Sequence, residues 1–154
     1  MANSRLIREA LSVPLEKAGF KKKSDTWYWG NDEVVLLLNL QKSQYGEQYY
    51  VNCGIGLKSL GAVDFPKENQ GHIRFRLTTL ADNEESRKSI ELLFDMESSP
   101  LYNQARQAKI THLIEELVLP IFQSCSSEVG VIKAVGAGLF AKAMVHKLVK
   151  DMIT

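Results

Sequence analysis

The stretch VVLLLNLQKSQYGEQYYVNCGIGL, residues 34–57, decides the fold. Two apolar runs flank a polar, glycine-containing link, which is typical of two strands joined by a turn. In an antiparallel hairpin the numbers of paired residues have a constant sum, and side chains alternate between the two faces. A sum of 91 makes one face wholly apolar, with Leu40 opposite Val51, Leu38 opposite Cys53, Leu36 opposite Ile55 and Val34 opposite Leu57. A slip of one residue would mix the faces, so we expect this register, with strands at about 33–42 and 48–58.

The other face of the predicted hairpin is polar near the turn. The same register pairs Asn39 with Asn52 and Gln41 with Tyr50. Neighbouring strands add a tyrosine on one side and two arginines on the other. We call these seven side chains the polar face: Tyr28, Asn39, Gln41, Tyr50, Asn52, Arg74 and Arg76.

The polar face is the candidate site for a ligand or a partner. Arg74 and Arg76 carry planar forks of donors that match a carboxylate or a phosphate, and amides and tyrosines surround them. A simpler interpretation stays open, because antiparallel sheets commonly carry solvent-facing cross-strand pairs on one side.

Two further strands are expected beside the hairpin. Residues 20–29 alternate in polarity, with Trp27 and Trp29 on the apolar side. Residues 72–77, HIRFRL, alternate in the same way and carry the two arginines on the opposite face. Residues 59–71 contain Gly, Pro and polar residues, which indicates a loop.

Helical spacing of apolar residues accounts for the rest of the chain. Helices are expected at 4–18, at 84–95, from Ser99 and Pro100 onward, within 126–138, and at about 138–153. Ser4 is the expected N-cap of the first helix, and Pro14 predicts a kink or two short pieces there. Pro120 is expected to bend or end the third helix. Its apolar stripe runs through Ala105, Ala108, Leu113, Leu117 and Ile121, with Ile110, Ile114 and Val118 beside it.

The order of elements predicts an α+β fold. Consecutive strands form a mainly antiparallel sheet of about four strands, and helices that follow in sequence pack on one face as a second layer. We expect a single domain over residues 1–154, with a core at about 4–135 and an additional C-terminal helix.

Composition excludes several classes of protein. The chain has 154 residues, 45% hydrophobic content and a net charge of +1, which signals neither nucleic acid nor an anionic membrane. Cys53 and Cys125 are far apart and indicate reduced, buried thiols. The N-terminus lacks a signal-peptide pattern, and no apolar run could cross a bilayer, so we expect a cytoplasmic protein.

Three segments resemble the bacterial family called domain of unknown function 4304: residues 18–46, 72–77 and 113–135. A Gly-Phe-Lys-Lys start precedes a Trp-Tyr strand, an apolar strand ends in Gln-Lys-Ser, His-Ile-Arg-x-Arg-Leu follows, and a late helix contains Leu-Pro. NLQKSQYG is the most specific block. The chain departs from the family pattern at 78–105, where a tryptophan-containing segment is expected. The resemblance implies the fold and the order of strands, but no catalytic residues.

Motifs for chemistry are scarce. His72, His112 and His146 lack a helical or Cys-x-x-Cys partner, so we expect no metal and no cofactor. A nucleophile motif is missing, and nucleic acid is disfavoured despite aromatic and basic residues on the sheet. The sequence therefore favours a non-enzymatic binding protein that uses the polar face, with an immunity or antitoxin-like role as an analogy. The alternative is an enzyme that acts on a small anionic or phosphate-containing substrate at the same face.

The last predicted helix suggests one more contact. Lys142, His146 and Lys150 would form a basic row opposite a wide apolar stripe. We expect that stripe to pack on the same domain or on a second copy, which would give a homodimer, and the helix could also fold across the polar face.

Overall fold

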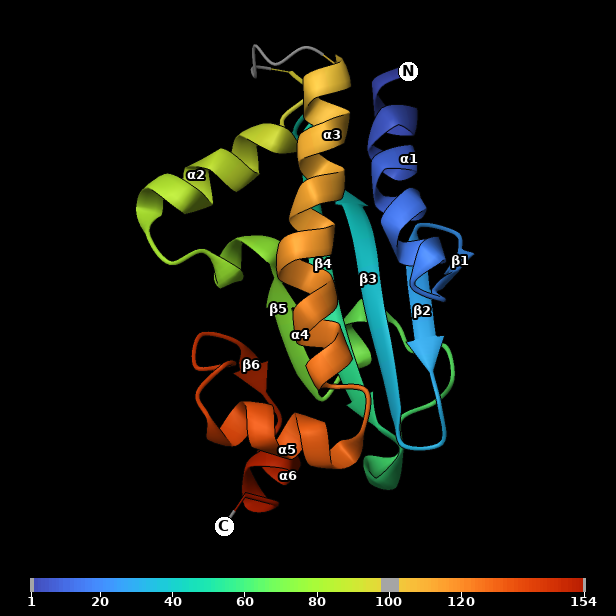
Figure 1. Ribbon diagram of the computed structural model, residues 1–154, viewed down its shortest axis with the longest axis vertical. Helices are drawn as coiled ribbons and strands as arrows, with labels where there is room; N and C mark the ends of the chain where they lie inside the picture. Colours follow the sequence, from blue (N-terminus) through green and yellow to red (C-terminus); the bar gives the residue numbers. More distant parts are fainter. Residues whose placement is uncertain (1, 98–102, 154) are drawn as a thin grey trace.

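Six antiparallel strands form the sheet in a computed structural model that describes residues 2–97 and 103–153 (Figure 1). The strands follow one another in sequence order across the sheet. They are β1 (Lys21–Lys23), β2 (Thr26–Gly30), β3 (Val34–Lys42), β4 (Tyr49–Leu57), β5 (Ile73–Arg76) and β6 (Met144–Val145). The sheet therefore has six strands instead of the predicted four or so, and its antiparallel character is confirmed.

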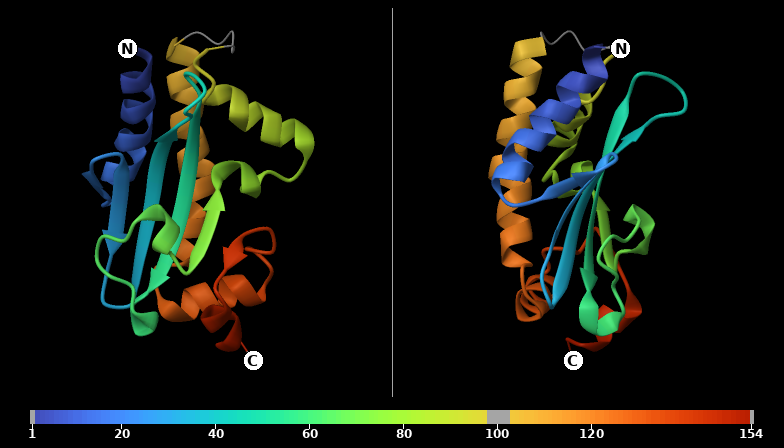
Figure 2. Two further views of the ribbon diagram at one scale, coloured as in Figure 1. Left: turned by 180° about the vertical axis from the view of Figure 1, so that it is seen from behind. Right: turned by 90° about the vertical axis from the view of Figure 1, so that its right-hand side faces the viewer.

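The helices are α1 (Ala2–Lys17), α2 (Glu84–Leu93), α3 (Asn103–Leu113), α4 (Leu119–Ser124), α5 (Glu128–Gly136) and α6 (Lys147–Asp151). A π-helical turn, η4 (Ile114–Val118), joins α3 to α4, and three 3₁₀ turns complete the chain: η1 (Lys58–Leu60), η2 (Glu68–Gln70) and η3 (Leu77–Leu80). Figure 2 shows α1, α3 and α4 on one face of the sheet and the loop between β4 and β5 on the other. The α+β class with helices packed on one face is thus confirmed.

The register of the central hairpin is as predicted. Leu40 pairs with Val51, Leu38 with Cys53, Leu36 with Ile55 and Val34 with Leu57. All eight side chains are buried. These residues form the sheet side of the hydrophobic core. A register shifted by one residue would turn them toward the other face, so their burial depends on this pairing.

The predicted strand at 20–29 is two strands. A tight turn with Ser24 at φ 59° separates β1 from β2, and β1 becomes an edge strand of three lysines. Lysine on an edge opposes pairing with another chain. Trp27 lies on the apolar side as predicted, where its indole Nε1 donates to Ser12 Oγ at 3.0 Å.

The helix that spans α3, η4 and α4 buries the residues expected beside the predicted stripe, Ile110, Ile114 and Val118, instead of the stripe itself. Ala105 and Ala108 are exposed, whereas Arg106 is buried. Its buried row, spaced by four residues, is Arg106, Ile110, Ile114, Val118 and Phe122. The predicted start at Ser99 and Pro100 lies outside the described residues.

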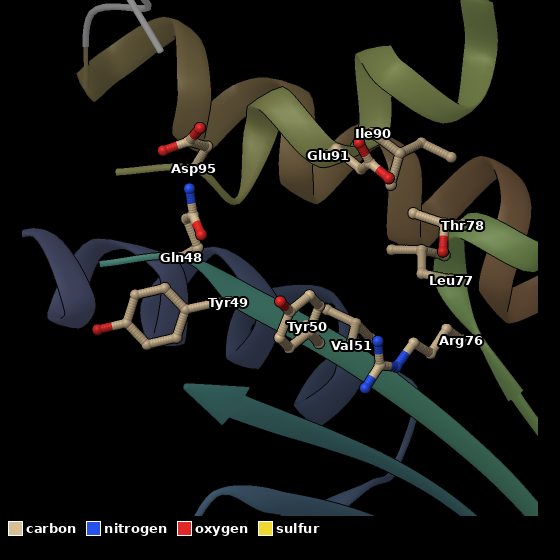
Figure 3. Close-up of a pocket in the computed structure, with 10 residues that line it drawn as sticks. All are labelled: Gln48, Tyr49, Tyr50, Val51, Arg76, Leu77, Thr78, Ile90, Glu91 and Asp95. Carbon is tan, nitrogen blue, oxygen red and sulfur yellow. The ribbon is translucent and has the colours of Figure 1, made fainter. Parts of the chain in front are cut away.

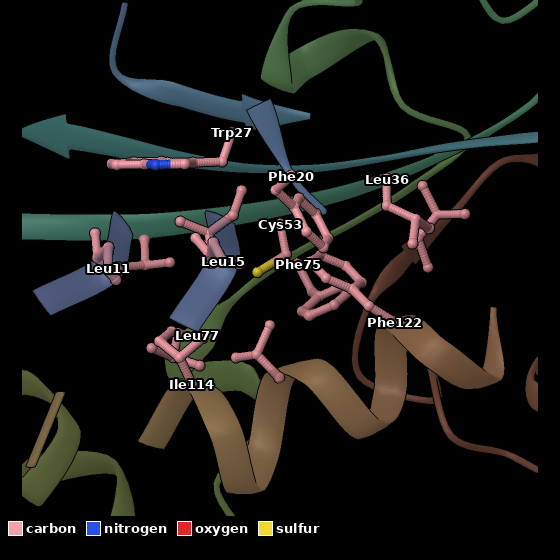
Figure 4. Packing of buried hydrophobic residues seen from close by; sticks show 14 of the residues in the cluster. Leu11, Leu15, Phe20, Trp27, Leu36, Cys53, Phe75, Leu77, Ile114 and Phe122 are labelled. Carbon is pink, nitrogen blue, oxygen red and sulfur yellow. The ribbon is translucent and has the colours of Figure 1, made fainter. Parts of the chain in front are cut away.

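The core lies between this row, α1 and the apolar face of the sheet (Figure 4). Phe20 stacks on Phe122 with ring centroids 5.6 Å apart. Cys53 and Cys125 are free and buried, as predicted, and burial raises the pKa of both thiols, that of Cys125 to about 12.

Pro14 and Pro120 lie in helices and are tolerated there. α1 is one helix from Ala2 to Lys17 with Pro14 inside it, so the prediction of two pieces is wrong, and Ser4 lies within the helix instead of capping it. Pro120 lies at the start of α4, directly after the π-helical turn, and the helix continues to Ser124. A proline lacks the N–H that the helix interior requires, and a π turn shifts the bonding pattern beside it.

The predicted helix at 138–153 is wrong. Gly138 has φ +85°, residues 139–143 form turns, and Met144 and Val145 pair with β5. His146 then caps the short α6 by accepting a hydrogen bond from the Leu148 N–H at its Nδ1. The basic row of Lys142, His146 and Lys150 therefore does not form, and neither does the helical surface on which we expected a second copy to pack.

Candidate functional site

The second face of the sheet carries a chain of hydrogen-bonded side chains across three strands. Asn52 Nδ2 donates to Asn39 Oδ1 at 3.1 Å and to Gln41 Oε1 at 2.9 Å. Arg76 Nε donates to Asn52 Oδ1 at 3.3 Å. The Arg76 guanidinium carbon lies 4.2 Å from the centroid of the Tyr50 ring. We call these five residues, Asn39, Gln41, Tyr50, Asn52 and Arg76, the amide ladder.

The strand register explains how the ladder assembles. Asn39, Asn52 and Arg76 are direct cross-strand neighbours, and Thr26 extends their row onto β2. Asn39 Nδ2 donates to Thr26 Oγ1 at 3.0 Å, which closes the row. Facing side chains of neighbouring strands are close enough to form hydrogen bonds. The predicted register of β3 and β4 therefore accounts for the contact between Asn39 and Asn52, and the pairings with β2 and β5 add Thr26 and Arg76.

Tyr28 does not join the ladder. It lies in the next row of the sheet, across Leu37 and Gly54 from Arg74. Its hydroxyl donates to the Pro66 carbonyl at 3.0 Å, and its ring meets Phe65 edge-on at 5.2 Å. The loop between β4 and β5 therefore covers Tyr28.

This loop also covers the middle of the second face. Val35 and Leu37 point away from the helices, yet both are buried. At Gly56 an added Cβ would lie 2.8 Å from Ala62 Cβ, which shows how closely the loop approaches the strand. Glu68 and Asn69 of the loop lie beside the ladder residues Gln41 and Asn52. The C-terminal segment pairs with the edge of β5 and does not form the predicted helix that could have folded across the polar face.

A hollow of about 370 Å³ lies beside the ladder. Its lining contains two guanidiniums, three amides and one carboxylate among Gln41, Asn52, Cys53, Glu68, Asn69, Arg74, Phe75, Arg76 and Met144. We call it the arginine hollow. Arg74 Nε is buried there and has no hydrogen-bond partner within residues 2–97 and 103–153.

A second hollow, of about 270 Å³, lies between β4, η3 and α2 (Figure 3). Tyr50 and Arg76 belong to the amide ladder and also line this hollow. On its opposite side, next to α2, lie Ile90, Glu91 and Asp95. The Glu91 carboxylate also pairs with Arg87 on the same helix. These acidic residues were not predicted, because no local pattern shows that α2 packs beside the start of β4.

The structure brings together two of the three histidines. The rings of His72 and His146 lie 5.9 Å apart, edge to face, and the His146 N–H donates to the His72 carbonyl at 2.7 Å. His72 Nδ1 accepts from the Leu57 N–H at 2.9 Å. Burial and the neighbouring His146 lower the pKa of His72, so this imidazole is a neutral acceptor. In the described part of the chain no three His, Cys, Asp or Glu residues are grouped as metal ligands.

The chemistry of the arginine hollow is dominated by donors. Guanidiniums and amide groups can hold a carboxylate or phosphate oxygen, whereas general acid–base chemistry needs a titratable group in reach. Glu68 is exposed, and burial raises the pKa of Cys53, so this thiol stays protonated at neutral pH. The arrangement is suited to recognition.

None of the described helices is long and apolar enough to cross a membrane. Fold and site together define an α+β domain in which an antiparallel sheet, backed by helices, presents a partly covered polar face. The chain belongs to the family described as Domain of unknown function (DUF4304), whose model matches residues 11–124. Neither the curated proteins nor the solved structures contain a match to the chain.

Proposed function

We propose that this chain is a non-enzymatic interaction protein whose polar face binds another protein. The observation that carries the proposal is a pair of exposed apolar side chains at the border of that face. Phe65 is 54% exposed and packs on Tyr28, and Met144 is 51% exposed and pairs with Arg74 at the sheet edge. Aromatic residues, methionine and arginine are the types enriched at the centres of protein interfaces.

The ladder supports binding because its side chains hold one another in place. Arg76 is fixed by its bond to Asn52 and by the Tyr50 ring. A side chain that is ordered before binding loses less conformational entropy when a partner arrives. The polar face therefore offers fixed donors between apolar anchors.

The enzyme alternative has weaker support. An enzyme acting on a small anionic or phosphate-containing substrate would use Arg74 and Arg76 to hold it, but it would also need a base or a nucleophile. Cys53 is buried with a raised pKa, and Glu68 lies on the exposed rim. These residues give the substrate a place to bind without a group to transform it.

Within this proposal the chain acts in the bacterial cytoplasm and its partner is a protein of the same cell. An immunity or antitoxin-like role fits a compact binding module, since such a protein works by covering a toxin. This biological setting is an analogy of size and architecture.

The test is a comparative pull-down from the organism that carries the gene. The wild type and the double variant Arg74→Ala/Arg76→Ala are compared with Arg5→Ala/Lys109→Ala, which removes the same charge from exposed positions on α1 and α3. We expect one protein to be recovered with the wild type and the control and lost with Arg74→Ala/Arg76→Ala. Equal recovery with all three proteins would refute the placement of the site on the polar face.

A further inference from the structure

We infer that the arginine hollow is a carboxylate site that receives an acidic side chain of the partner protein. The inference rests on the proposed function and names the chemistry that the partner brings to it.

The first observation is the state of Arg74. Its Nε is buried without a hydrogen-bond partner in the part of the chain that the structure describes. A buried N–H without a partner costs about 1–3 kcal/mol, and such groups are rare enough in native proteins to require an explanation. Because this Nε has almost no surface accessible to solvent, the Arg74 side chain has to shift when the partner binds, and an acceptor that enters the hollow then satisfies the donor.

The second observation is that Arg76 lines the same hollow two residues along β5. The ladder holds its Nε, and its terminal nitrogens have no hydrogen-bond partner among the described residues. Two guanidiniums from alternate positions of one strand lie on the same face of the sheet. Each presents donors in a planar fork, which is the geometry that a carboxylate accepts.

The charge balance favours a carboxylate over a phosphate. Arg74 and Arg76 contribute two positive charges and Glu68 one negative charge, so the lining sums to +1. A single carboxylate neutralises this charge, whereas a phosphate dianion would leave an excess negative charge beside Glu68. The remaining polar groups are the amides of Gln41, Asn52 and Asn69, which can donate to the same oxygens.

An acidic segment of a protein fits better than a free small acid, because the hollow opens beside exposed Met144. A partner residue could place its carboxylate on the arginines while a neighbouring apolar residue covers the methionine. A charged anchor next to an apolar contact is a common arrangement in interface centres.

The inference can be tested without a known partner, by NMR of the arginine Nε–Hε groups. The probe is an acetylated and amidated peptide with one glutamate between glycines, and its control is the same peptide with glutamine in place of the glutamate. We expect the glutamate peptide to shift the Arg74 resonance in a saturable way and the glutamine peptide to leave it unchanged. No saturable shift, or an equal response to both peptides, would overturn the inference.

Variants test which arginines bind the peptide, and inorganic phosphate tests whether the hollow prefers a carboxylate. Arg74→Gln should weaken peptide binding by about 10- to 100-fold, the loss expected when charge-assisted hydrogen bonds are removed. Arg76→Gln should weaken it as well, and Lys109→Gln should have no effect. Inorganic phosphate should bind more weakly than the glutamate peptide. Tighter phosphate binding would overturn the carboxylate assignment.

Failure of the inference and failure of the proposed function give different results. If the pull-down recovers a partner that depends on Arg74 and Arg76 while the peptide does not bind, the interaction surface stands and the carboxylate assignment is wrong. If the peptide binds but protein recovery is the same with every variant, the proposed function is wrong, and the assignment to a partner's side chain is wrong with it.

Discussion

Replacing Arg106 with methionine removes a buried positive charge that joins two helices. The side chain is 2% exposed. Its Nη1 donates to the carbonyls of Leu92 and Leu93 at 2.9 and 2.8 Å and to that of Asp95 at 3.3 Å. These carbonyls lie at the C-terminal end of α2, where the last C=O groups of a helix have no partner within the helix and the dipole favours a positive charge.

The expected loss of stability follows from these contacts. A hydrogen bond to a charged group contributes about 1.5–3 kcal/mol, and here two bonds are short. Burial lowers the pKa of Arg106, because desolvation disfavours the charged guanidinium. Methionine removes this desolvation penalty and fills most of the volume of the arginine side chain, which offsets part of the lost hydrogen bonding. We therefore expect the free energy of unfolding to fall by about 2–4 kcal/mol, the range for breaking a buried polar network.

The assay is urea denaturation together with thermal unfolding. A loss of 2–4 kcal/mol corresponds to a melting temperature about 5–15 °C lower in a chain of this size. Hydrogen exchange should accelerate first in α2, because Arg106 ties its end to α3. Lys109→Met is the matched control on an exposed position of α3 and should change stability by about 0.5 kcal/mol or less. A loss with Arg106→Met as small as that of the control would refute the reasoning.

Three further substitutions test the sheet and its polar face. Gly56→Ala should destabilise the fold by about 1–3 kcal/mol in urea denaturation, because the new Cβ would lie 2.8 Å from Ala62 Cβ. His72 accepts the hydrogen bond from the Leu57 N–H only when its imidazole is neutral, and its pKa in the folded protein is lowered below 6.5. As the pH falls, the unfolded chain therefore binds this proton before the folded protein does. The free energy of unfolding, measured in urea, should decrease as the pH drops from about 7 to 5. His72→Gln should reduce this pH dependence. Asn52→Val should lose the partner in the pull-down but cost less than about 1 kcal/mol of stability, because strand propensity offsets the loss of partly exposed hydrogen bonds.

Each of these substitutions has a control in the same chain. Gly136→Ala meets no atom closer than 3.8 Å and should not destabilise the fold. His112→Gln removes an exposed histidine and should leave the pH dependence of stability unchanged, and Gln104→Val on α3 should leave partner recovery unchanged. If a test variant and its control give the same stability, pH dependence or partner recovery, the contact assigned to the test position does not contribute to that property.

The hairpin of β3 and β4 was predictable because one of its faces is apolar at every pair, whereas the other is polar near the turn. Only one register keeps Leu36 and Leu38 opposite Ile55 and Cys53, and the structure has that register. The same register brought most of the candidate side chains into the amide ladder. Tyr28 stays apart because it lies in the next row of the sheet, under a loop without periodicity whose path no local pattern encodes.

The C-terminal segment shows where periodicity misleads. Residues 139–153 have helical apolar spacing, yet Met144 and Val145 form a strand because the edge of β5 offers them backbone hydrogen bonds. That pairing joins residues far apart in sequence, so a local helical preference yields to a tertiary contact. A helix and a strand compete for the same short apolar segment, and the sequence alone does not show which partner is nearby.

Arg106 shows what an apolar pattern does not reveal. It lies in register with Ile110, Ile114, Val118 and Phe122, although a charged residue is rarely buried in such a row. The carbonyls at the end of α2 make its burial possible, and their position depends on how α2 packs beside α3. The four-residue spacing of this row can be read from the sequence, but the α2 carbonyls that bind Arg106 cannot.

Site-specific photo-cross-linking in living cells tests the central claim most directly. A photoreactive phenylalanine analogue is placed at Gln41, an exposed member of the amide ladder, or at Glu9, an exposed position on α1 in the helix layer. A polar face that binds a protein predicts a discrete cross-linked partner from Gln41 and none from Glu9. Cross-links from Glu9 alone, or the same products from both positions, would contradict the account.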